Sequence, residues 1–113
     1  MDSDSRRMPR RSVSDPVEVT DTMTGEVVGQ LANLSVGGML LITAAHLVED
    51  AIYQLRFDLP DRNGHPIEVG AHLLWRADAG APGKNWAGMQ FLGLSPEATV
   101  RLRDWSERDA SPS

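Results

Sequence analysis

The stretch Tyr53-Gln54-Leu55-Arg56-Phe57-Asp58-Leu59 alternates apolar and polar side chains at every position. Successive side chains of a β-strand point to opposite faces of a sheet, so this alternation is typical of a strand with one buried face. A dense run of turn-forming residues follows at 60–64, and a second alternating segment begins at Ile67. The two segments therefore predict strands joined by a turn.

Further strands are predicted on both sides of this pair. Val17–Thr20 alternates, and Thr24-Gly25 favours a turn before a return strand over Glu26–Ala32. Met39–Ile42 is a short apolar run typical of a strand covered on both faces, and the last strand is expected at Trp86–Leu92. The segment Ala44–Asp50 fits a loop or a single helical turn. Six strands with short connections predict a closed antiparallel barrel, because closure removes the exposed edges of an open sheet.

The core is expected to hold two of the three tryptophans. The segment after Ile67 places five apolar side chains on one predicted face: Ile67, Val69, Ala71, Leu73 and Trp75. Trp75 therefore belongs to the predicted core, and Trp105 belongs to it by helical spacing. Trp86 stands beside a glycine-rich loop, and its environment is left open.

A C-terminal helix is predicted from Ser95-Pro96-Glu97 to about Arg108. A hydroxyl cap, a proline at the first helical position and an acid in the first turn all favour a helix start here. One stripe of this helix is apolar: Ala98, Leu102 and Trp105. Two pairs at four-residue spacing are expected to form ion pairs on the solvent side: Glu97 with Arg101, and Asp104 with Arg108.

Two polar features remain outside this scaffold. The segment Met1–Asp15 has no hydrophobic period, is predicted to be a flexible arm, and carries four arginines: Arg6, Arg7, Arg10 and Arg11. Asn33 and Ser35 lie two apart in a strand-like run, so their side chains are expected on one face, and the Gly37-Gly38 pair that follows lets the backbone turn or approach closely. Arginine binds phosphate and the guanine edge bidentately, so this combination suggests an anionic, guanine-bearing ligand. The structural alternatives are a solvated tail and an ordinary turn.

These residues resemble the motifs of the PilZ domain family. The run Arg6-Arg7-Met8-Pro9-Arg10-Arg11 contains the Arg-x-x-x-Arg motif twice, and Asn33-Leu34-Ser35-Val36-Gly37-Gly38 fits the Asp/Asn-x-Ser-x-x-Gly motif. Gly88-Met89-Gln90-Phe91 resembles the run of the last barrel strand in that family, and Trp75 closes an earlier strand. Three short motifs in the family's order are much more specific than any one of them. The resemblance covers roughly Arg6 to Leu94.

The residue patterns and the resemblance together predict an all-β fold, a six-stranded antiparallel split barrel. The patterns add a flexible N-terminal arm (1–15), one C-terminal helix that completes the barrel unit (16–109) and a frayed tail (110–113). The resemblance implies a non-catalytic bacterial receptor for cyclic di-GMP that needs no metal or other cofactor and signals to an unidentified effector protein. The implied ligand-binding residues are Arg6, Arg7, Arg10, Arg11, Asn33, Ser35, Gly37 and Gly38. The motif arginines can be Arg6 and Arg10, or Arg7 and Arg11.

Composition limits the other possibilities. Cysteine is absent, which fits a cytoplasmic protein. The net charge is −5, which argues against broad affinity for nucleic acid or anionic membrane. The histidines His46, His65 and His72 lack metal-ligand spacing, and no catalytic set of nucleophile, base and orienting group can be assembled. Two alternatives stay open: a barrel that acts as a protein-interaction module without binding nucleotide, and a small RNA-binding barrel, which the acidic charge disfavours.

Overall fold

The computed structural model describes residues 10–13, 16–61 and 64–108. Its elements in chain order are β1 (Arg11–Ser12), β2 (Glu18–Asp21), β3 (Val27–Leu34), β4 (Gly38–Thr43), β5 (Ile52–Phe57), β6 (Ile67–Asp78), β7 (Asn85–Leu92) and α2 (Pro96–Arg108). Each strand predicted from the sequence is present, with ends that differ by a few residues. The short strand β1 was not predicted. Residues 44–50 form a loop.

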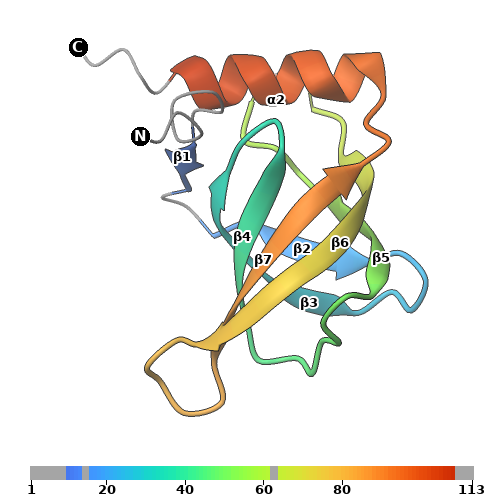
Figure 1. The fold of residues 1–113 in the computed structure, drawn as a ribbon. Coiled ribbons are helices and arrows are strands. Elements are labelled where there is room, and N and C mark those ends of the chain that lie inside the picture. Colours follow the sequence, from blue (N-terminus) through green and yellow to red (C-terminus); the bar gives the residue numbers. More distant parts are fainter. Residues whose placement is uncertain (1–9, 14–15, 62–63, 109–113) are drawn as a thin grey trace.

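Six strands close into an antiparallel barrel (Figure 1). Neighbouring strands follow the order β3-β2-β5-β6-β7-β4, and β4 pairs with β3 to close the ring. β2 pairs with β3 as far as Gln30, and β1 pairs with the same strand further on, at Leu34 and Asn33. The prediction of a six-stranded antiparallel barrel with a C-terminal helix is therefore confirmed, with β1 as an additional strand.

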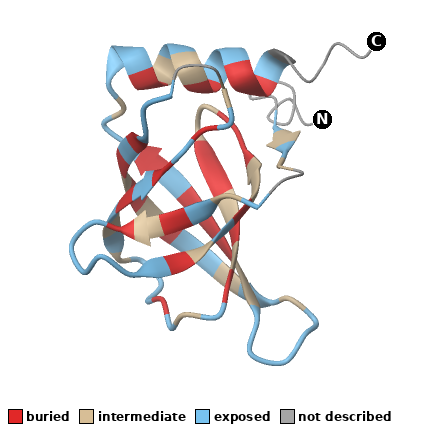
Figure 2. Ribbon diagram, turned by 180° about the vertical axis from the view of Figure 1, so that it is seen from behind, coloured by how far each residue is buried: buried red, intermediate tan, exposed pale blue. Residues whose placement is uncertain are grey.

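The barrel interior is filled by the apolar sides of the alternating strands. In β5, Leu55 and Phe57 are buried whereas Gln54 and Arg56 are exposed, as the sequence predicted. The first half of β6 alternates in the same way (Figure 2). Burying these side chains contributes about 1.5–3 kcal/mol each relative to exposure, so the alternation selects which face of each strand turns inward.

α2 lies across one end of the barrel (Figure 1). The Ser95 hydroxyl oxygen accepts a hydrogen bond from the Ala98 N–H at 3.0 Å, which is the predicted cap. The predicted apolar stripe is confirmed, since Ala98, Leu102 and Trp105 are all buried.

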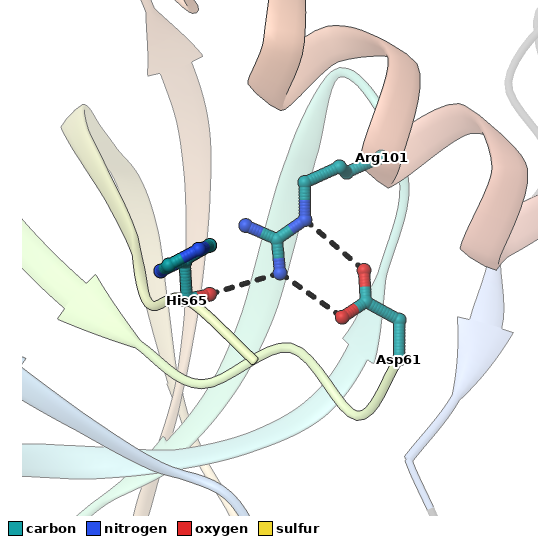
Figure 3. Close-up of polar contacts among 3 residues, drawn as sticks. All are labelled: Asp61, His65 and Arg101. Carbon is teal, nitrogen blue, oxygen red and sulfur yellow. Dashed lines mark hydrogen bonds and ion pairs between the residues drawn. The ribbon is translucent and has the colours of Figure 1, made fainter. Parts of the chain in front are cut away.

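The first half of α2 is tied to the loop between β5 and β6. Arg101 binds both carboxylate oxygens of Asp61, through Nε at 3.1 Å and a terminal nitrogen at 3.0 Å, and donates to the His65 carbonyl oxygen at 2.9 Å (Figure 3). The prediction of a solvent-side pair between Arg101 and Glu97 is therefore wrong, because a bidentate carboxylate within reach across the barrel end offers better geometry than a neighbour one turn away. The side chain of Arg108 lies outside the described residues, so its predicted pairing with Asp104 stays a prediction.

Part of the predicted flexible arm has a defined position. Residues 10–13 lie against the barrel, and the Val13 N–H donates to the Ala32 carbonyl oxygen at 2.9 Å. Arg6, Arg7 and the predicted tail at 110–113 lie outside the described residues. Among the described residues, none of the helices is both long and apolar enough to cross a membrane.

Candidate ligand-binding site

Ser35 shapes the turn between β3 and β4. Its side chain is 1% exposed, and its hydroxyl oxygen accepts a hydrogen bond from the Gly37 N–H at 3.2 Å. The Ser35 N–H also donates to the Gly38 carbonyl oxygen at 2.9 Å, which closes the hairpin. A serine that bonds the backbone two residues on is a common turn device. The structure therefore places the Ser35 hydroxyl inside the turn, as the structural alternative in the sequence analysis describes.

The two glycines after Ser35 bring β4 against β7. The Gly37 carbonyl oxygen accepts from the Phe91 N–H at 3.0 Å. A Cβ added to Gly38 would lie 2.1 Å from the carbonyl oxygen of Met89, so only glycine allows this approach of the two strands. Gly38 is paired in β4 and does not have a positive φ, so close approach rather than turn conformation explains the glycine.

Asn33 faces outward at the same hairpin and contacts the arm. The Arg10 guanidinium donates to the Asn33 side-chain oxygen at 2.6 Å. Ser12 is the direct cross-strand partner of Asn33 in the β1–β3 ladder, and directly opposed residues share a face of a sheet. Arg10, two residues before Ser12, lies on that face as well. The structure thus brings together Arg10 and Asn33, two of the predicted site residues.

Arg11 points to the opposite side of β1. Its guanidinium lies over the Trp105 ring, 4.3 Å from the ring centroid, and donates to the Trp105 carbonyl oxygen at 3.0 Å. Adjacent residues of an extended segment face opposite ways, which agrees with Arg10 contacting Asn33 and Arg11 contacting Trp105. Of the predicted arginines that the structure describes, only Arg10 reaches the Asn33 side.

A β-bulge in β6 turns Trp75 outward. The pairing of β6 with β7 shifts register between Leu73 and Trp75, which makes Leu74 the extra residue. Trp75 is consequently 44% exposed and Leu74 50% exposed. The prediction that Trp75 belongs to the core is wrong, because a bulge reverses the inward and outward alternation of every residue that follows it. The indole lies across Gly88, where an added Cβ would be 2.3 Å from a ring atom.

These features line one open hollow of about 230 Å³ on the outer wall of the barrel, which we call the Arg10–Trp75 hollow. Its lining residues are Arg10, Asn33, Met39, Leu40, Leu74, Trp75, Gly88 and Met89. A guanidinium and an amide stand on one side and an indole on the other. Such a set suits a planar aromatic ligand with acceptor atoms along one edge or an anionic group beside it. A second hollow of about 530 Å³, across β2 and β5, contains none of the predicted site residues.

Sequence reasoning missed the apolar half of this hollow. The available signal was the run Leu73-Leu74-Trp75, three apolar residues in succession within an otherwise alternating strand. Such a break in alternation is typical of a bulge. Gly88, on the neighbouring strand, is a second signal, because glycine in a strand often marks a site where another group lies against the backbone.

Comparisons with known proteins agree with this architecture. The family model of the PilZ domain matches residues 4–108. The inhibitor of motility MotI/DgrA of Bacillus subtilis superposes with a TM-score of 0.77 at 16% identity, covering 93% of this chain and 51% of that protein. YcgR of Escherichia coli in complex with c-di-GMP gives a TM-score of 0.72 at 23% identity, covering 93% of this chain and 47% of that protein. The PilZ domain of YcgR with c-di-GMP gives 0.68 at 20% identity, with 93% of each chain covered.

Identities this low establish the shared fold alone. The chain spans about half the length of the MotI/DgrA chain and of the YcgR chain in the complex with c-di-GMP. Among curated proteins there is no significant sequence match.

Proposed function

Because the chain belongs to the PilZ domain family, we propose that it is a receptor for cyclic di-GMP and binds this ligand at the Arg10–Trp75 hollow. Cyclic di-GMP carries two guanine bases and two phosphodiester groups. Guanine offers two acceptors, N7 and O6, to a guanidinium, and the phosphates offer anionic oxygens. The ligand therefore matches both halves of the hollow. Its guanine edges and phosphates suit the polar side, and the face of one base suits the indole.

The observation that carries the proposal is the hydrogen bond between Arg10 and Asn33 at the rim of the hollow. It holds a guanidinium at the position where a ligand edge would lie, so less conformational entropy is lost on binding. The Trp75 ring, half-exposed across the hollow, supplies a stacking surface for one base. At about 230 Å³ the hollow is smaller than most ligand pockets, so it would receive one base while the rest of the ligand lies along the surface toward the arm.

The same geometry favours one register of the arginine motif. Arg10 faces Asn33, whereas Arg11 is engaged with Trp105 on the other side of β1. In this proposal the motif arginines are therefore Arg6 and Arg10, with Arg7 placed among the residues near the ligand by sequence alone. Asn33 contacts the ligand, while Ser35, Gly37 and Gly38 contribute by setting the turn and the strand approach that position Asn33.

The bound protein would act without catalysis, by presenting the ligand and the ordered arm to an effector protein. The chain spans about half the length of the MotI/DgrA and YcgR chains, so the effector protein is proposed from family membership.

Titration calorimetry tests the proposal with cyclic di-GMP, linear GMP and a short RNA as ligands. We expect a much higher affinity for cyclic di-GMP than for GMP or the RNA. Arg10→Ala should lower the affinity for cyclic di-GMP by about one to two decades, because the loss of one bidentate contact costs roughly 1–3 kcal/mol. Arg103→Ala is the matched control, because it removes an exposed arginine of α2 that does not line the hollow. Equal affinities for cyclic di-GMP and GMP, or unchanged binding by Arg10→Ala, would contradict the proposal.

A further inference from the structure

β1 contacts two different parts of the molecule through its two faces. On one side Ser12, and Arg10 directly before the strand, face Asn33 at the rim of the Arg10–Trp75 hollow. On the other side Arg11 covers the ring of Trp105 and donates to its carbonyl oxygen. Trp105 lies three residues before the end of α2, and Figure 1 shows β1 beside that end of the helix. One short strand thus joins the candidate ligand site to the C-terminal turn of α2.

The contact between Arg11 and Trp105 is a substantial part of what holds β1. The strand has only two residues and two ladder pairs with β3, far shorter than a strand of ordinary length. A guanidinium over an indole face is a favourable cation–π arrangement, and a cation at the last carbonyls of a helix also interacts favourably with the helix dipole. Trp105 is itself 3% exposed, so the surface that receives Arg11 is fixed in the core.

The two halves of α2 are held by different partners. The first half has the Ser95 cap and the partly buried ion pair between Arg101 and Asp61 (Figure 3). The last turn contacts Arg11 of the arm. The part of the last turn beyond the buried Trp105 can therefore gain or lose order with β1 while the first half stays in place, because local opening follows the local distribution of contacts.

We propose that Arg11 and Trp105 form a clamp that positions Arg10 at the ligand site, so that ligand binding and the seating of the last turn of α2 stabilise each other. The inference rests on the proposed function for the identity of the ligand. Arg11 and Trp105 act here as positioning residues, since neither lines the hollow. Coupling free energies are reciprocal: if the clamp raises the affinity for the ligand, the ligand must strengthen the clamp by the same factor. The C-terminal turn of α2 is then more ordered when the ligand site is occupied than when it is empty.

Calorimetry on variants tests the first half of this coupling. Arg11→Gln and Trp105→Leu should each weaken cyclic di-GMP binding by roughly three- to tenfold, the range of a partly buried cation–π contact. The double variant should bind no more weakly than either single variant, because both remove the same contact. Arg103→Gln should bind like the wild type. Additive losses in the double variant would show that Arg11 touches the ligand directly and would overturn the clamp.

Trp105→Leu can also destabilise the core, so Trp105→Phe is included. It keeps an aromatic face for Arg11 and removes an indole N–H for which the described residues supply no acceptor. It should retain most of the affinity that Trp105→Leu loses. Equal losses in both variants would overturn the role of the ring face.

Amide hydrogen exchange tests the reciprocal half and separates it from the proposed function. In the wild type, cyclic di-GMP should slow exchange over residues 102–107 but not over 98–101, and Arg11→Gln should abolish this difference. Without any ligand, Arg11→Gln should speed exchange of the Val13 amide, which bonds the Ala32 carbonyl oxygen beside β1. Failure of the wild type to bind cyclic di-GMP would overturn the proposed function. The ligand-free measurement at Val13 would still test the clamp, and unchanged exchange there in Arg11→Gln would overturn the clamp.

Discussion

The approach of β4 to β7 at Gly38 makes a sharp prediction about stability. In Gly38→Ala, the new Cβ would lie 2.1 Å from the Met89 carbonyl oxygen and 3.2 Å from its carbon. Both are backbone atoms of a paired strand, so they cannot rotate away as a side chain can. The end of β4 must therefore move off β7 to accommodate one methyl group.

The cost follows from the contacts that this movement breaks. The hydrogen bond from the Phe91 N–H to the Gly37 carbonyl oxygen and the pairing of Gly38 with Gln90 lie at the affected end. Each backbone hydrogen bond contributes about 0.5–1.5 kcal/mol, and repacking the buried neighbour Met39 adds about 1–3 kcal/mol. We expect a loss of about 2–4 kcal/mol in the free energy of unfolding, or a Tm lower by about 10–20 °C for a domain of this size.

Urea and thermal unfolding followed by circular dichroism measure this change, with Gly88→Ala as the matched control. A Cβ at Gly88 would also lie too close to another group, at 2.3 Å, but that group is the ring of Trp75, a side chain that is 44% exposed, so we expect the ring to move outward. Alanine in place of a strand glycine gains about 0.5–1 kcal/mol, so Gly88→Ala should stay within about 1 kcal/mol of the wild type. Equal stability of Gly38→Ala and Gly88→Ala would refute the argument that a clash with the backbone costs more than a clash with an exposed side chain.

Two further substitutions test polar contacts with little solvent exposure. Ser35→Ala removes the acceptor of the Gly37 N–H and should lower the free energy of unfolding by about 1–2 kcal/mol, measured by urea denaturation; an unchanged midpoint would show that the hydroxyl is not needed for the turn. Asp61→Asn breaks a bidentate ion pair whose side chains are 14% and 10% exposed. It should lower the free energy of unfolding by about 2–4 kcal/mol, measured by thermal unfolding. The control Asp104→Asn, on the exposed side of α2, should lower it by less than about 0.5 kcal/mol. Similar losses for the two aspartate variants would contradict the importance of this pair.

The sequence predicted the candidate site only in part. The arginine cluster and Asn33 were proposed from residue type and spacing, and the structure brings Arg10 and Asn33 into contact. Ser35 was expected to contact a ligand, and the structure places its hydroxyl in the turn. Trp75 was assigned to the core, because period-two alternation was continued through a position where β6 gains an extra residue. One bulge was enough to remove the tryptophan from the core and place it at the hollow.

Local patterns by themselves determined the strands, the C-terminal helix and the barrel class. Alternation in Tyr53–Leu59 and the cap at Ser95 depend on neighbours in sequence, and the burial of Leu55, Phe57 and the helix stripe follows from them. Contacts between distant segments required the tertiary structure: Arg11 with Trp105, 94 residues apart, and Arg101 with Asp61, 40 residues apart. Side-chain chemistry shows that an arginine will seek an acceptor or a ring, but closure of the barrel decides which acceptor lies within reach. For the same reason two adjacent arginines have different partners: Arg10 contacts Asn33 at the hollow, and Arg11 contacts Trp105 in α2.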